Sequence, residues 1–198
     1  MNACIARSEL ILGGQKSGKS RRAELLARDW LAQSGDHRAV FIATGQAWDD
    51  EMRARIARHQ RDRAARVPGL QTVEEPHDVA AAVALHGTPQ TLVVVDCLTL
   101  WLTHWTMPIG VETMNFEQKQ ALTHNWQAQA AMFVIAIRKS PGPVVLVGNE
   151  IGLGVIPMGR EVRAFVDALG LLNQQAAQAC ERVTLMAAGL PLTLKETG

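Results

Sequence analysis

The sequence predicts an α/β fold with a mostly parallel sheet, and two observations lead to this prediction. Several short apolar runs are continuous rather than alternating, which is typical of strands buried on both faces: residues 10–12, 39–43, 91–95 and 144–147. Longer segments with apolar residues at helical spacing separate these runs. Strands that alternate with helices in this way form a sheet covered by helices on both faces.

The composition is that of an ordinary globular protein, and we expect one domain over residues 1–198. The chain is 47% hydrophobic and 20% charged, without a low-complexity tract or a linker. Its net charge of +1 gives no electrostatic case for a nucleic-acid partner. No run approaches the roughly 18 apolar residues that span a bilayer, and no secretory signal is apparent. We therefore expect a soluble, cytoplasmic protein with no membrane span and no nucleic-acid partner.

The cysteine pattern agrees with a reducing compartment. Cys4, Cys97 and Cys180 are scattered and odd in number, without C-x-x-C spacing. This pattern argues against both a disulfide framework and a zinc site.

A glycine-rich loop between the first predicted strand and a predicted helix at 20–33 is the clearest motif. Its sequence, GGQKSGKS, matches G-x-x-x-x-G-K-[ST]. Glycines let backbone N–H groups turn toward phosphate oxygens, and the helix N-terminus adds a favourable dipole. Lys19 should reach the β- and γ-phosphates, and the Ser20 hydroxyl should ligate Mg²⁺. We therefore predict a triphosphate-binding loop made of Gly13, Gly14, Gln15, Lys16, Ser17, Gly18, Lys19 and Ser20.

The second predicted strand, residues 39–43, ends at Thr44-Gly45 and leads to an arginine-rich helix at 49–66. Acidic residues at its start complement the helix dipole. At about 100° per residue, four side chains share one face of this helix: Met52, Ile56, His59 and Arg63. From these residues alone two interpretations stay open. Charge runs usually form a solvated face, with the histidine at its edge; alternatively, the helix presents a histidine to a site.

A second nucleotide-linked motif is the run TLVVVD at residues 91–96. An aspartate at the C-terminal end of a buried strand, downstream of a phosphate loop, fits the Walker B pattern, which holds Mg²⁺ directly or through water. Many strands end in aspartate simply as a helix cap. Because the phosphate loop is present, we favour the metal role, with Ser20 and Asp96 as the Mg²⁺ ligands.

The remaining elements follow from periodicity. They are a short extended piece, three helices, a buried strand, a long helix and two short strands: residues 70–73, 77–86, 97–106, 113–138, 144–147, 159–181, 183–186 and 192–194. Asn149 and Glu150 follow the buried strand, where open α/β sheets bind ligands. The last two strands, joined through Gly189-Leu190-Pro191, should form an antiparallel pair. The whole order predicts a three-layer P-loop NTPase fold of the RecA-like type.

Taken together, the motifs resemble those of one enzyme family. The phosphate loop is followed by IATGQAWDDEMRARIARHQRDR, VVVDCLTLWLT, GNEIGLGVIP, LGLLNQ and AAGLPLTLK. This series, from about residue 10 to residue 195, resembles the bifunctional adenosylcobinamide kinase/adenosylcobinamide-phosphate guanylyltransferase family. Many NTPases share the phosphate loop, whereas D-D-E-M-x-x-R-I-x-x-H and N-E-x-G-x-G-x-x-P are much more specific.

The resemblance implies a late step of cobalamin nucleotide-loop assembly. Family members phosphorylate the aminopropanol hydroxyl of adenosylcobinamide with ATP or GTP. They then transfer GMP from GTP to that phosphate, which releases pyrophosphate and forms adenosylcobinamide-GDP. The implied cofactor is Mg²⁺, with GTP and ATP as substrates and a corrinoid as the other small-molecule partner. The implied assembly is a homo-oligomer, which is a trimer in known members.

The resemblance also implies the roles of individual residues. The guanylylated histidine of the family matches His59, so that His59 and Lys19 are the predicted catalytic residues. A neutral imidazole can attack the α-phosphorus of GTP, and Arg55 and Arg63 could stabilise charge on the transferred group. The guanine-nucleotide site should then be lined, beyond the phosphate loop, by Ala43, Thr44, Gly45, Gln60, Arg61, Asp62, Arg63, Glu74 and Asp96.

The sequence departs from the usual family pattern outside the core motifs, at Gln15-Lys16, Leu70, His104, Val166 and Cys180-Glu181. The last two departures are expected to affect corrinoid contacts or subunit packing. Two other functions also stay open. A P-loop small-molecule kinase without guanylyl transfer would not depend on His59. A nucleotide-dependent switch or assembly ATPase would account for the arginine-rich helix, but no N-K-x-D guanine motif is apparent.

Overall fold

A twisted sheet lies at the centre of the computed structural model, which describes residues 5–47, 49–108 and 110–197, apart from the side chains of Met52, Arg55 and Glu112. In the described residues the sheet has seven strands in the order β3-β2-β4-β5-β1-β6-β7. The strands are β1 (Ser8–Gly13), β2 (Arg38–Ala43), β3 (Leu70–Glu74), β4 (Thr91–Asp96), β5 (Val144–Val147), β6 (Arg182–Ala187) and β7 (Leu190–Glu196). All neighbouring strands are parallel except β6 and β7.

Some sequence predictions fall outside this part of the chain. They concern Cys4, the side chains of Met52 and Arg55, and the two ends of the expected domain. For these positions the predictions stand as made from the sequence.

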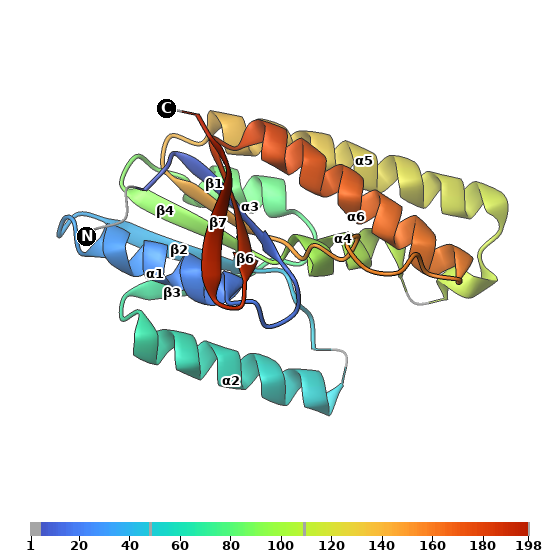
Figure 1. Ribbon diagram of the computed structural model, residues 1–198, viewed down its shortest axis with the longest axis horizontal. Helices are drawn as coiled ribbons and strands as arrows, with labels where there is room; N and C mark the ends of the chain where they lie inside the picture. The colour runs from blue at the N-terminus through green and yellow to red at the C-terminus, as the bar shows by residue number, and fades with distance from the viewer. Residues whose placement is uncertain (1–4, 48, 109, 198) are drawn as a thin grey trace.

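Helices cover both faces of the sheet, so the fold has three layers (Figure 1). On one side lie α1 (Lys19–Leu31) and α2 (Asp50–Arg66). On the other side lie α3 (Val79–His86), α4 (Leu98–Thr106), α5 (Phe116–Lys139) and α6 (Arg160–Ala179), with a single 3-10 turn, η1, at Val111–Thr113. The predicted α/β fold class is therefore confirmed.

Two apolar cores explain why the strands read as continuous apolar runs. Ile11 and Phe41 point to one face and pack with α1, whereas Leu10 and Leu12 point to the other and pack with the helices there. Because both faces are buried, successive strand residues are all apolar. β1 nevertheless begins with buried polar residues, since Glu9 accepts hydrogen bonds from Arg22 and Thr184.

The strand order brings the phosphate loop and Asp96 to the same edge of the sheet. β5 lies between β1, which leads into the phosphate loop, and β4, which ends at Asp96. This separation of the two strands is the RecA-like arrangement of a P-loop NTPase. The parallel strands open their carboxyl ends to the same edge, where ligands bind in such sheets.

The C-terminal strand pair is present, but its connection is shorter than predicted. The turn consists of Ala188 and Gly189, with φ of 52° and 81°, and Ala187 already pairs with Leu190. Positive φ at both turn residues matches the twist of the flanking strands. Pro191 therefore belongs to β7, an edge strand that tolerates a residue without an N–H donor.

The lengths and apolar contents of the helices bear on whether the chain could cross a bilayer. Among those in the described residues, none is both long enough and apolar enough to span a membrane.

Candidate active site

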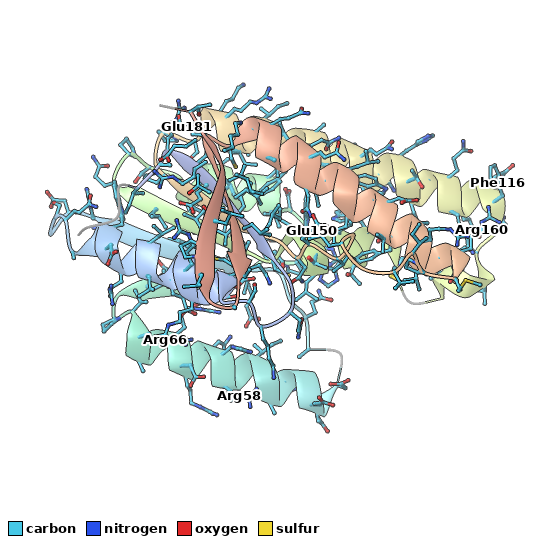
Figure 2. All side chains as sticks on the ribbon, viewed as in Figure 1. Arg58, Arg66, Phe116, Glu150, Arg160 and Glu181 are labelled. Atoms are coloured by element: carbon cyan, nitrogen blue, oxygen red, sulfur yellow. The ribbon has the colours of Figure 1, made fainter. Side chains whose placement is uncertain are left out.

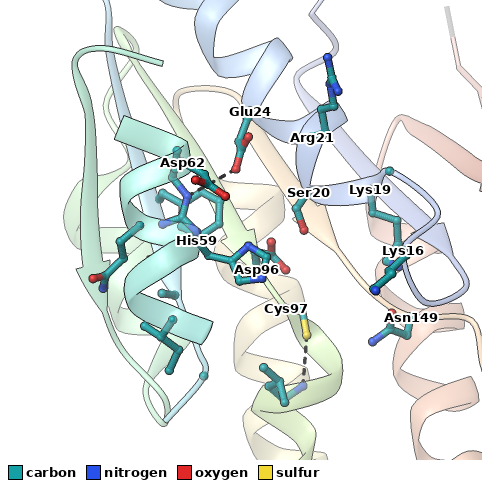
Figure 3. Close-up of a pocket in the computed structure, with 18 of the residues that line it drawn as sticks. Lys16, Lys19, Ser20, Arg21, Glu24, His59, Asp62, Asp96, Cys97 and Asn149 are labelled. Carbon is teal, nitrogen blue, oxygen red and sulfur yellow. Dashed lines mark hydrogen bonds and ion pairs between the residues drawn. The ribbon is translucent and has the colours of Figure 1, made fainter. Parts of the chain in front are cut away.

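A cavity of about 540 Å³ lies between the phosphate loop and α2 at the carboxyl edge of the sheet. Its walls come from segments far apart in sequence: the loop and α1, the end of β2, α2, β3 and the end of β4 (Figure 3). The predicted site residues that line it are Gln15, Lys16, Ser17, Gly18, Lys19, Ser20, Ala43, Gly45, His59, Gln60, Asp62, Arg63, Glu74 and Asp96. The structure thus brings most of the predicted residues together around one space.

Four predicted nucleotide-binding residues do not line this cavity: Gly13, Gly14, Thr44 and Arg61. Gly13 has φ of 152°, and a Cβ atom there would lie 2.5 Å from the Met186 carbonyl oxygen. Gly14 is exposed and offers its carbonyl oxygen to the loop itself. Arg61 is exposed on α2. The close approach of Gly13 to Met186 shapes the loop, whatever contacts the two glycines make with a nucleotide.

Lys19 is buried at the base of the loop. Its Nζ donates hydrogen bonds to the carbonyl oxygen of Gly14 at 2.6 Å and to Oγ of Ser17 at 3.5 Å. Burial lowers the pKa of Lys19, and the nearby Asp96 carboxylate opposes this shift. The ammonium group is thus held inside the loop, where the phosphates of a nucleotide would lie.

Asp96 lies at the end of β4 and lines the cavity beside the Ser20 side chain (Figure 3). Burial raises the pKa of Asp96, while Ser20, Arg63, Lys19 and His59 each act in the opposite direction. A hydroxyl and a carboxylate side by side are the protein ligands that a nucleotide-bound Mg²⁺ uses, with phosphates and waters completing its shell. The described residues contain no cluster of three His, Cys, Asp or Glu that could hold a metal without such help.

The face of α2 that was singled out from the sequence does turn toward the cavity. Ile56, His59 and Arg63 all line it, and Figure 3 shows His59 beside Asp96. Other arginines of the helix, such as Arg58, are exposed (Figure 2). The basic helix therefore has a solvated side and a cavity side, and the role of the histidine stays a prediction.

Arg63 is buried and fixed from three directions. Its guanidinium lies 3.4 Å from the centroid of the Phe41 ring and donates from Nη1 to Oγ1 of Thr72 at 3.2 Å. Its Nε is 3.7 Å from Oε1 of Glu24. Burial lowers the pKa of Arg63, and the carboxylates of Asp96 and Glu24 counteract that shift. A positive charge is thereby kept at the rear of the cavity.

Thr44 lies behind the cavity wall rather than in it. It is fully buried, and its hydroxyl donates to the Cys97 carbonyl oxygen at 2.8 Å and accepts from the Cys97 N–H at 2.9 Å. The Thr44 side chain therefore fixes the backbone of Cys97, which directly follows Asp96. On the other side of Thr44, its carbonyl oxygen lies 2.8 Å from Nε2 of His104. Since a carbonyl only accepts, the Nε2 of His104 carries the hydrogen.

Of the other departures from the family pattern, Gln15 and Lys16 line the cavity, whereas Leu70, Val166 and Cys180-Glu181 do not. Leu70 packs against the core next to α1, and Cys180 is buried at the end of α6. The Glu181 carboxylate accepts from the Arg7 N–H at 3.2 Å. Val166 is half-buried on α6. The expected effects of Val166 and Cys180-Glu181 on corrinoid contacts stay predictions.

Several residues that line the cavity were not predicted from the sequence, including Glu24, Phe41 and Leu100. Glu24 could have been predicted from the sequence, because it follows Ser20 by one helical turn and so lies on the same face of α1. Phe41 lies within an apolar strand, and nothing in its sequence context indicates a place in the cavity wall. Asn149, which was placed near the site with less support, does line the cavity.

A triphosphate-binding loop that shares its cavity with a histidine-bearing helix defines a P-loop nucleotide-dependent transferase. Sequence comparison gives the particular family. Residues 9–194 match the model of the cobinamide kinase / cobinamide phosphate guanyltransferase (CobU) family. The chain belongs to this family.

Individual relatives agree over nearly their full lengths. The chain is 42% identical to the bifunctional adenosylcobalamin biosynthesis protein CobP of Pseudomonas aeruginosa, over 94% of this chain and 96% of the relative. It is 34% and 32% identical to the proteins CobU of Escherichia coli K12 and Salmonella typhimurium, in each case over 94% of this chain and 98% of the relative.

A solved structure with a similar fold is the flagellar accessory protein FlaH from Methanocaldococcus jannaschii. The TM-score is 0.52 at 11% identity, and the match covers 98% of this chain and 81% of FlaH. At this identity the likeness concerns the fold alone.

Proposed function

We propose that this chain catalyses two consecutive reactions in the assembly of the cobalamin nucleotide loop. It phosphorylates adenosylcobinamide with ATP or GTP, and it then transfers GMP from GTP to adenosylcobinamide phosphate, with release of pyrophosphate. Family membership supports the pair of reactions. The structural observation that carries the proposal is that Lys19 and His59 line one cavity, so that a bound triphosphate is within the space that both share.

For phosphoryl transfer, the loop and Lys19 hold the phosphates. Backbone N–H groups of residues 13–20 and the N-terminus of α1 stabilise negative charge on the phosphate oxygens. We assign Ser20 and Asp96 as the protein ligands of Mg²⁺, which when bound neutralises charge on the phosphates. The corrinoid hydroxyl attacks the γ-phosphorus, the bond from that phosphorus to the bridging oxygen breaks, and the nucleoside diphosphate leaves.

For guanylyl transfer, His59 is the proposed nucleophile. A neutral ring nitrogen forms a bond to the α-phosphorus of GTP, the bond to the β-phosphate oxygen breaks, and pyrophosphate leaves with that electron pair. A phosphate oxygen of the corrinoid then attacks the same phosphorus, and the nitrogen–phosphorus bond breaks. The buried guanidinium of Arg63, one helical turn from His59, stabilises charge on the transferred group.

We assign the nucleotide contacts to the remaining residues of the cavity wall. Beyond the loop these are Ala43, Gly45, Gln60, Asp62, Arg63, Glu74 and Asp96. Gln60 donates a hydrogen bond to the Glu74 carboxylate at 3.0 Å, which leaves carboxylate lone pairs for the N–H groups of a guanine. Thr44 acts behind this wall rather than in it.

The assembly and the compartment are part of the same proposal. We propose one catalytic domain that forms a homo-oligomer, a trimer by family resemblance, in the cytoplasm. Exposed apolar side chains between β5 and α6 support association: Ile151, Leu153, Val155, Ile156 and Met158. Cys97 and Cys180 are both free thiols, as a reducing compartment requires. Light scattering of the purified chain, with a trimer mass expected and a monomer mass contradicting it, tests the assembly.

The function is tested by supplying adenosylcobinamide, ATP, GTP and Mg²⁺ and resolving the corrinoids by chromatography and mass. The expected sequence is adenosylcobinamide phosphate first and adenosylcobinamide-GDP afterward. If the phosphate accumulates and no GDP derivative forms with GTP in excess, the chain is a kinase alone. If neither product forms, the assignment to corrinoids is wrong.

A further inference from the structure

Glu24 is a buried carboxylate of the cavity that neither proposed reaction uses. It lies on α1, is only 3% exposed, and follows Ser20 by one helical turn. Figure 3 shows the Glu24 carboxylate pointing from α1 toward α2, while Ser20, on the same helix, lies near Asp96. A carboxylate buried to this degree requires partners, because isolated charges in a low dielectric are unfavourable.

The partners of Glu24 are two arginines of the second half of α2. Its Oε2 lies 2.9 Å from Nε of Arg66, and its Oε1 accepts from Nη2 of the same arginine at 3.4 Å. Arg63 Nε lies 3.7 Å from Oε1. Burial raises the pKa of Glu24, and the charges of Arg66 and Arg63 oppose that shift. One carboxylate therefore connects the helix of the phosphate loop to the helix of the nucleophile.

The connection has a defined register. Arg63 follows His59 by one turn of α2, just as Glu24 follows Ser20 by one turn of α1. Residues at this spacing lie on the same helix face. The pairing of Glu24 with Arg63 and Arg66 therefore sets Ser20 and His59 on facing sides of the same cavity.

We propose that Glu24 is a positioning residue for guanylyl transfer, which fixes α2 so that His59 lies opposite the phosphate loop. This inference rests on the proposed role of His59. Phosphoryl transfer from the loop to the corrinoid uses no residue of α2 as a nucleophile, so loss of this pairing affects guanylyl transfer more strongly. A nucleophile displaced by about 1 Å loses about a hundredfold in rate.

The chain offers a matched control. Glu9 is also a buried carboxylate, 1% exposed, and pairs with Arg22 at 2.8 Å and with Arg182 at 3.5 Å. It lies on β1 and does not line the cavity. Glu9→Gln therefore removes a buried ion pair of similar kind without touching α2.

The test compares two rates in each variant, normalised to the folded fraction from thermal denaturation. One is enzyme labelling by GTP carrying a label at the α-phosphate, and the other is phosphoryl transfer to adenosylcobinamide from ATP labelled at the γ-phosphate. For Glu24→Gln we expect the ratio of labelling to phosphoryl transfer to fall about tenfold or more. For Glu9→Gln we expect the ratio of the wild type. Equal ratios in Glu24→Gln and the wild type would overturn the inference.

A double-mutant cycle with Arg66→Met separates pairing from packing. If the pair acts as a unit, the double variant lowers the ratio no further than Glu24→Gln alone. Additive losses would contradict the pairing. If Glu24→Gln fails to fold, Arg66→Met is tested instead, because the Arg66 side chain is 43% exposed and its replacement disturbs the core less. A fall in the same ratio of labelling to phosphoryl transfer then supports the inference, and an unchanged ratio overturns it. If the wild type itself retains no label, the proposed role of His59 fails; if only the ratio is unchanged, the role of Glu24 fails.

Discussion

The Ser20 side chain at the start of α1 lies beside the Asp96 carboxylate at the end of β4 (Figure 3), and it lowers the pKa of that carboxylate, which burial raises. The two residues are 76 positions apart, and the strand order with β5 between β1 and β4 brings them together. The phosphate loop and the acidic end of β4 are thereby brought to one place in the cavity. Several consequences of this geometry can be measured.

The first prediction concerns Asp96 and pH. Burial raises the folded-state pKa of Asp96 above its ordinary value of 3.8, so its stabilising contribution is present at low pH and is lost as pH rises through the folded pKa. Asp96→Asn should therefore make the nucleotide-free chain more stable relative to wild type as pH rises from about 4 to 8. The same variant should lose about a hundredfold or more in phosphoryl transfer with Mg²⁺. Thermal denaturation across this pH range checks the sign, and a variant less stable than wild type at neutral pH contradicts it.

The second prediction concerns Lys19. Replacing its buried ammonium by the apolar side chain of Lys19→Met removes the cation from the phosphate loop. Both reactions should fall by about 10²–10³-fold, because both need the triphosphate held there. Steady-state rates measure the effect, with the exposed Lys139→Met as the control expected to match wild type. Guanylyl transfer that persists at the wild-type rate in Lys19→Met would place GTP elsewhere.

The third prediction compares the two adjacent glycines of the loop. Gly13 has φ of 152°, and an added Cβ would meet the Met186 carbonyl oxygen at 2.5 Å and the Ser17 hydroxyl at 2.6 Å. Gly14 has no atom within 4 Å of such a Cβ. Gly13→Ala should therefore destabilise the fold by about 1–3 kcal/mol and weaken nucleotide binding, whereas Gly14→Ala should keep wild-type stability. Urea denaturation and nucleotide titration test the pair; equal effects would show that the loop is not shaped by this contact.

The fourth prediction concerns Thr44. Thr44→Val removes a hydroxyl that bonds both the N–H and the carbonyl of Cys97, so two buried backbone groups lose a partner. We expect a loss of about 1–3 kcal/mol in the free energy of unfolding and a fall in kcat through the displaced Asp96. Thr44→Ser keeps the hydroxyl and should restore kcat. If Thr44 instead contacts the nucleotide directly, Thr44→Val raises KM for GTP without loss of stability.

The sequence was informative about elements whose physics is local. The continuous apolar runs predicted the buried strands, and the glycine-rich loop before a helix predicted the phosphate site. The cavity-facing side of α2, with His59 and Arg63, followed from helical spacing and was strengthened by the family resemblance. In each case the residues that carry the signal lie within a few positions of one another.

The features that sequence reasoning missed depend on contacts between distant segments. Phe41 supports Arg63 only because β2 and α2 pack together, and nothing in an apolar strand indicates this. The family resemblance implied that Thr44 lines the guanine-nucleotide site, but it gave no sign that the Thr44 hydroxyl bonds the backbone of Cys97, 53 residues away. The start of β1 at Ser8, before the predicted apolar run, was not predicted because Glu9 is polar and gave no sign of being in a buried strand. Hydrogen bonds from Arg22 and Thr184 allow the Glu9 carboxylate to be buried.

His59 is the proposed nucleophile, and both guanylyl transfer and the positioning role of Glu24 depend on it. Wild-type chain incubated with Mg²⁺ and GTP labelled at the α-phosphate should retain label through denaturing electrophoresis, and the label should be acid-labile and alkali-stable, as a phosphoramidate is. His59→Ala should retain none, while His124→Ala, which changes an exposed histidine of α5, should label like wild type. Label retained by His59→Ala at the wild-type level, or a wild type without label, would contradict the account.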